Sequence, residues 1–78
     1  MQTITLNEAN ELFKDILSQG LPKIQVTPTI NKIHFDEDGC SYDLLFYKGN
    51  LVKIESYDKR ELIEKFVIKN ENWFWKED

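Results

Sequence analysis

Histidine and cysteine, which often carry acid–base and nucleophilic chemistry, each occur once in this sequence of 78 residues, as His34 and Cys40. A catalytic nucleophile needs a neighbouring base, and that base needs a group to orient it. No nucleophile-elbow glycines are present, and so short a chain does not easily enclose a pocket of about 300 Å³. We therefore expect no enzymatic activity, no catalytic residue and no cofactor. We expect His34 to have a structural role, facing Asp43 across a sheet.

A second candidate site is the acidic run Asp36-Glu37-Asp38 together with Asp43. Carboxylates on a tight loop suit a hard cation, but the alternating oxygen ligands and distal glutamate of a calcium loop are missing. The acidic run is typical of a solvated hairpin tip, and no metal is expected there. A third interpretation is that these four residues bind a basic groove on a partner protein, which would make association fast and sensitive to salt.

The aromatic run Trp73-Phe74-Trp75 is the third candidate. Tryptophan dominates many protein-binding hot spots, which favours a partner-binding role for Trp73 and Trp75. The alternative is that a small domain uses these large side chains to fill its core.

Composition limits the class of protein. The length predicts one domain over residues 1–78, with about 60% of the unfolded surface buried. Fourteen acidic against ten basic residues give a net charge of −4, which disfavours direct binding to nucleic-acid phosphates. One cysteine excludes an internal disulfide framework, and no secretory signal or membrane-length apolar run is visible. We expect a cytoplasmic protein that does not enter a membrane.

The elements that would position these residues are predicted from periodicity and turn signals. Thr5 and Glu8 fit a capping box, and apolar residues at steps of three and four predict a helix over residues 6–19 that ends at Gly20. Alternation over residues 24–30 predicts a strand, which Pro28 places at a sheet edge.

Two hairpins are predicted next, with Asp38-Gly39 and Gly49-Asn50 as two-residue loops. The first would set Phe35 opposite Tyr42 and Ile33 opposite Leu44, and the second would set Leu45 opposite Ile54. Asp58 and Glu61 fit a second capping box, so a short helix is predicted over residues 58–66, followed by a C-terminal strand at Trp73-Phe74-Trp75. The predicted fold is α+β: an N-terminal helix, a three- to four-stranded antiparallel β-meander and a second short helix after its third strand. Helices would cover one face of the sheet, and the other face would meet a partner.

The sequence favours a small acidic protein-binding module that docks on a larger protein. In size, charge and compactness it resembles phage-encoded inhibitors of bacterial defence, such as anti-CRISPR and anti-restriction proteins. The resemblance implies a partner that binds nucleic acid and an acidic face that blocks its nucleic-acid channel. One alternative is a structural homodimer or an assembly subunit. A further alternative is a nucleic-acid-binding domain that uses Lys53, Lys59 and Arg60.

Overall fold

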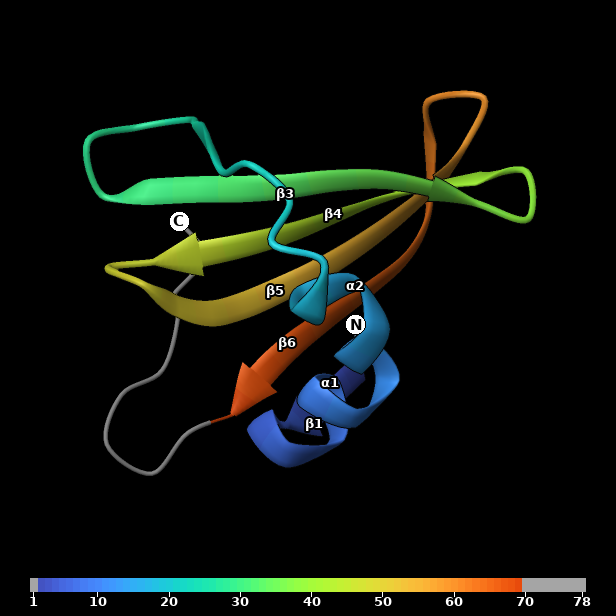
Figure 1. Ribbon diagram of the computed structural model, residues 1–78. Coiled ribbons are helices and arrows are strands. Elements are labelled where there is room, and N and C mark those ends of the chain that lie inside the picture. Colours follow the sequence, from blue (N-terminus) through green and yellow to red (C-terminus); the bar gives the residue numbers. More distant parts are fainter. Residues whose placement is uncertain (1, 70–78) are drawn as a thin grey trace.

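The computed structural model describes residues 2–69, which form one mixed sheet of six strands with two short helices against it (Figure 1). The elements are β1 (Gln2–Thr5), α1 (Leu6–Leu12), α2 (Lys14–Ser18), β2 (Ile24–Gln25), β3 (Ile30–Glu37), β4 (Cys40–Tyr47), β5 (Asn50–Asp58) and β6 (Glu61–Lys69). The strand order is β1-β6-β5-β4-β3-β2, and β1 runs parallel to β6. The predicted fold class is therefore wrong, because the sheet has more strands and a strand precedes the helices. The predicted C-terminal strand lies outside the described residues.

Three tight hairpins connect β3 to β6. Each turn has two central residues with positive φ: Asp38 and Gly39, Lys48 and Gly49, Lys59 and Arg60. Positive φ at both positions is the geometry whose twist matches that of antiparallel strands. The first turn was predicted correctly, and the second lies one residue earlier than predicted, because Tyr47 pairs with Asn50.

The register of the first hairpin is the predicted one: Phe35 pairs with Tyr42 and Ile33 with Leu44. The register of the second hairpin is different. Leu45 lies opposite Lys53 and not Ile54, and an irregularity between Leu45 and Phe46 shifts the pairing. A bulge of this kind inserts an extra residue and lets a strand keep its apolar side chains on the core face on both sides of it.

The N-terminal helix is broken into two pieces. Thr5 caps α1 as predicted: the Glu8 amide donates to Thr5 Oγ1 and the Thr5 amide donates to Glu8 Oε1. Phe13, with φ −115° and ψ 23°, interrupts the helix, and its ring packs edge-on against Phe35 and Tyr42. The helix is thus interrupted at the residue whose ring packs on the sheet. No helix within residues 2–69 is long and apolar enough to cross a membrane.

The second predicted helix is wrong, since its residues form the end of β5, a turn and β6. Glu61 is not a capping residue here: it pairs with Asp58 across the turn. β6 is held on both sides, by β5 and by β1, and this tertiary pairing outweighs the weak local signal for a helix.

Of the residues predicted as one strand, 24–30, Ile30 begins β3 and only Ile24–Gln25 form a strand of their own, β2. It lies at the sheet edge, as Pro28 suggested, but it pairs at only two positions and both its residues are exposed. Past it, a turn forms in which the Ile30 and Thr29 amides donate to Thr27 Oγ1.

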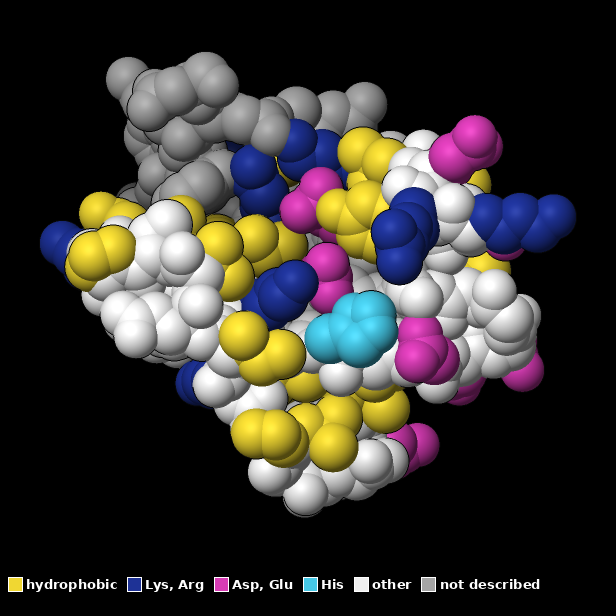
Figure 2. All heavy atoms as spheres, turned by 90° about the horizontal axis from the view of Figure 1, so that it is seen from above, with side chains coloured by type: hydrophobic (Ala, Val, Ile, Leu, Met, Phe, Trp, Pro, Cys, Tyr) yellow, Lys and Arg dark blue, Asp and Glu magenta, His cyan; other side chains and the backbone are white. Residues whose placement is uncertain are grey.

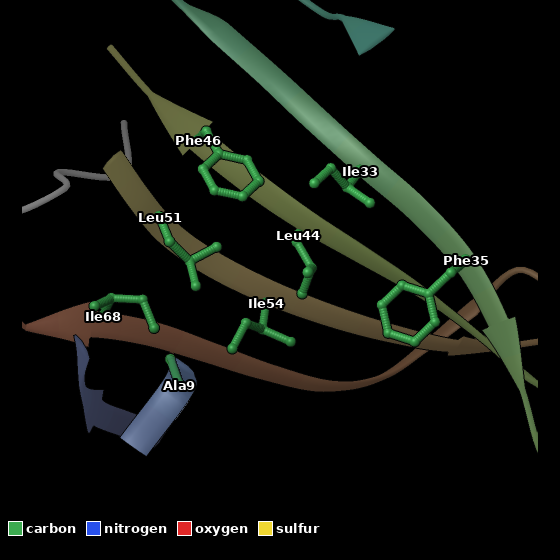
Figure 3. Close-up of a cluster of buried hydrophobic side chains, with 8 residues drawn as sticks. All are labelled: Ala9, Ile33, Phe35, Leu44, Phe46, Leu51, Ile54 and Ile68. Atoms are coloured by element: carbon green, nitrogen blue, oxygen red, sulfur yellow. The ribbon is translucent and has the colours of Figure 1, made fainter. Parts of the chain in front are cut away.

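The core lies between the helices and one face of the sheet. Alternate residues of the central strands point to this face, and Figure 3 shows their apolar side chains in one cluster with Ile68 of β6 and Ala9 of α1. Its buried members are Ala9, Ile33, Phe35, Leu44, Phe46, Leu51, Ile54 and Ile68. The opposite face of the sheet carries the residues that lie between these in the sequence.

Candidate functional site

The sheet face turned away from the helices carries polar side chains on β3 and on the adjoining parts of β4 and β5, and Leu45 and Tyr47 of β4 lie on the same face. We call the polar part the polar face and define it by these side chains: Lys32, His34, Asp36, Ser41, Asp43, Glu55 and Tyr57. A groove of about 470 Å³ runs over it, and Lys32, His34, Asp36, Ser41, Asp43, Tyr57 and Arg60 line the groove. Figure 2 shows the histidine among acidic and basic side chains.

His34 and Asp43 lie at the centre of this face. Nδ1 of His34 is 2.8 Å from Oδ1 of Asp43, which confirms the predicted cross-strand contact. Lys32 Nζ is 3.8 Å from the other carboxylate oxygen, Oδ2. The Asp43 side chain is 16% exposed, and the histidine and the lysine therefore surround a half-buried carboxylate. Asp43 therefore contacts two residues of its own chain and is separate from the acidic run Asp36-Glu37-Asp38.

Ser41 and His34 do not form a nucleophile–base pair. The Ser41 hydroxyl donates to Asp36 Oδ1 at 2.6 Å, and His34 Nε2 lies 3.5 Å from the same oxygen. Both side chains are thus directed to a carboxylate, and no serine–histidine hydrogen bond occurs within residues 2–69. Acyl transfer would require that bond or its equivalent.

Tyr57 borders the groove on β5. Burial raises the pKa of its hydroxyl to about 12, and the negative charge of Glu55 and a hydrogen bond to that carboxylate add to the effect. The Tyr57 hydroxyl therefore stays neutral and donates a hydrogen bond throughout the physiological range.

On neighbouring β6, burial lowers the pKa of Lys65, and the nearby ammonium of Lys53 adds to this effect.

The acidic run Asp36-Glu37-Asp38 lies at the same end of the sheet as a second turn that also carries carboxylates. Asp36, Glu37 and Asp38 are all exposed, as expected for a hairpin tip. The β5–β6 turn lies at the same end of the sheet (Figure 1) and adds two exposed carboxylates, Asp58 and Glu61. We call Asp36, Glu37, Asp38, Asp58 and Glu61 the acidic end. Its last two members are not predicted from the sequence, because the local pattern around them favours a helix.

Two predicted site residues, Trp73 and Trp75, lie outside the described residues. Within residues 2–69, no group of three histidine, cysteine, aspartate or glutamate side chains is placed to hold a metal ion. Lys53, proposed as a nucleic-acid contact, is only 7% exposed, whereas Lys59 and Arg60 are exposed on the turn between Asp58 and Glu61.

Comparison with protein-family models, with curated proteins and with solved structures finds no match to this chain.

Proposed function

We propose that the protein is a binding module that docks its acidic end on a basic surface of a larger protein. The observation that carries this proposal is that the five acidic-end carboxylates are exposed and lie in or next to two turns at the same end of the sheet, where Lys59 and Arg60 are the basic residues of the described turns. Such a concentration of one charge steers association with an oppositely charged surface and makes it fast.

The geometry of the two turns supports docking without rearrangement. Each is a two-residue turn whose two flanking strands pair with each other directly from the turn, although the β5–β6 pairing shifts register between Ser56 and Tyr57. Carboxylates on such turns keep a fixed spacing, so little conformational entropy is lost when a partner binds.

The partner that fits best is a protein whose own ligand is a nucleic acid. A channel that holds phosphates is lined with lysine and arginine, and a rigid row of carboxylates competes for the same side chains. On this proposal the chain acts as a phage-type inhibitor of a defence complex, of the anti-CRISPR or anti-restriction kind. Direct nucleic-acid binding by the chain is less favoured, because Lys53 is buried and carboxylates flank Lys59 and Arg60.

The test uses two purified targets, a CRISPR nuclease loaded with guide RNA and a restriction endonuclease. DNA binding by each target is measured with increasing amounts of the protein at several salt concentrations. We expect inhibition of at least one target that weakens as salt rises, because exposed charges are screened.

The matched variants carry the same change in net charge at two places. Glu37→Gln with Asp38→Asn removes two carboxylates from the acidic end, whereas Glu11→Gln with Asp15→Asn removes two exposed carboxylates from α1 and α2. We expect the first pair to weaken inhibition about tenfold or more and the second pair to leave it nearly unchanged. Equal effects of the two pairs, or no inhibition of either target by the unmodified protein, would contradict the proposal.

A further inference from the structure

Within residues 2–69, no strand pairs with the outer edge of β3 over residues 33–37, and we call this stretch the open edge. β2 pairs with β3 only at Asn31 and Lys32, and no other strand within residues 2–69 lies on the side of β3 away from β4. An open edge presents backbone N–H and C=O groups that a further strand can pair with.

The ladder between β3 and β4 determines which backbone groups face outward. A two-residue turn is closed by a hydrogen-bonded pair, here Glu37 with Cys40, and bonded and non-bonded pairs alternate from there. Even-numbered residues of β3 therefore direct their N–H and C=O groups away from β4. The carbonyl of Ile30 follows this rule, since it accepts the Val26 amide at 2.9 Å on the outer side. By the same rule, the outward groups on the open stretch belong to His34 and Asp36.

We propose that this edge pairs with the same edge of a second copy of the chain, antiparallel and centred on Phe35. In that register His34 lies opposite the partner's Asp36, and Asp36 lies opposite the partner's His34. Both are positions with outward backbone groups, so each forms a reciprocal pair of N–H···O=C bonds. A two-fold axis relates the copies, as in most homodimers.

The charges along β3 favour a second copy over any other added strand. Lys32 and His34 lie toward one end of the strand, and Asp36, Glu37 and Asp38 lie toward the other. Antiparallel pairing brings the basic end of each copy to the acidic end of the other. The side chains of His34 and the partner's Asp36 would then meet on the polar face.

The extent of the open edge agrees with this register. Residues 33–37 are symmetric about Phe35, and the next position, Lys32, is already paired with Ile24. The β3–β4 turn of the second copy therefore lies beside Ile24, a residue that is 50% exposed. The two polar faces become one continuous surface, and the β5–β6 turn stays outside the contact. The dimer does not depend on the docking function proposed above, and it competes with docking, because it places Asp36, Glu37 and Asp38 of the acidic end beside the second copy.

Light scattering coupled to size-exclusion chromatography tests the dimer directly. We expect the protein to elute with twice the chain mass of 9.3 kDa at high concentration. Asp36→Pro removes the outward N–H but spares the ladder to β4, because the amide at this position does not bond β4. Asp36→Ala removes the same carboxylate and keeps the N–H, which makes it the matched control. We expect Asp36→Pro to weaken dimerisation about 30-fold relative to Asp36→Ala, since one donor is lost from each copy.

Hydrogen exchange gives a second measurement that needs no variant. The amides of His34 and Asp36 should exchange more slowly at high protein concentration than at low, whereas those of Ile33 and Phe35, bonded to β4, should not change. A monomer at all concentrations up to about 1 mM would overturn the proposal. So would a dimer that the proline variant forms as well as the alanine variant does, or one in which the His34 and Asp36 amides show no added protection.

Discussion

Nδ1 of His34 and Oδ1 of Asp43 lie 2.8 Å apart on neighbouring strands. The Asp43 carboxylate also lies near Lys32, and the Asp43 side chain is only 16% exposed. A hydrogen bond to a charged carboxylate is stronger than one to a neutral group, so neutralising Asp43 should weaken its bond to His34. We expect Asp43→Asn to lower the free energy of unfolding by about 1 kcal/mol, measured by urea denaturation. Glu11→Gln is the control: its side chain is exposed on α1, so a change within about 0.5 kcal/mol is expected. Equal losses in the two variants would show that burial of Asp43 has no energetic consequence.

Leu44 is fully buried at the centre of the core, between Ile33 and Ile54 on the adjacent strands. Leu44→Ala should cost about 3 kcal/mol, because it removes buried surface and leaves a cavity. In a domain this small such a loss is a large fraction of the total stability. Leu62→Ala, at a strand position that is 50% exposed, should cost far less. The measurement is the urea midpoint of each variant, and similar midpoints would place the core elsewhere.

Lys59 and Arg60 adopt positive φ, at 51° and 73°, in the β5–β6 turn. Glycine takes this conformation without the steric cost that a side chain imposes. Arg60→Gly should therefore raise the free energy of unfolding by about 0.5–1 kcal/mol, seen as a higher melting temperature. Were this segment a helix, the same change would destabilise it by about 1 kcal/mol. Lys14→Gly in α2 provides that comparison and should lower the melting temperature.

The raised pKa of Tyr57 predicts a loss of stability in alkali. Tyrosine in the unfolded chain ionises near pH 10, whereas burial and Glu55 hold the folded hydroxyl neutral up to about pH 12. The unfolded state therefore releases a proton first, and stability falls as the pH rises from about 10 to about 12. Tyr57→Phe cannot ionise, so its free energy of unfolding should fall less over this range. Parallel curves for the two proteins would contradict the pKa assignment.

Local signals in the sequence predicted the parts of the fold that depend on neighbouring residues. Asp38-Gly39 specified the first turn, and the alternation on either side of it then fixed the pairing of Phe35 with Tyr42 and of His34 with Asp43. The Thr5 capping box was likewise visible, because it involves residues only three apart. The part of the candidate site on β3 and β4 followed from these signals.

The rest of the fold depends on contacts that no local signal carries. Lys59 and Arg60 are not typical turn residues, so the strand β6 was taken for a helix, and with it Asp58 and Glu61 were misplaced. β1 is too short to show periodicity, and it is recognisable as a strand only through its partner β6. The interruption at Phe13 arises because its ring packs on Phe35, which helix periodicity does not encode.

The parallel pairing of Gln2 with Phe66 has a kinetic consequence. The three hairpins join neighbouring segments and can form early, but β1 reaches its place only after the chain has closed a loop of more than sixty residues. Contacts of such long sequence separation slow folding, and they cannot form during synthesis until the distant segment has emerged from the ribosome. Between the emergence of β6 and its pairing with β1, the outer side of β6 is an unprotected edge, and strands of other chains can compete with β1 for it.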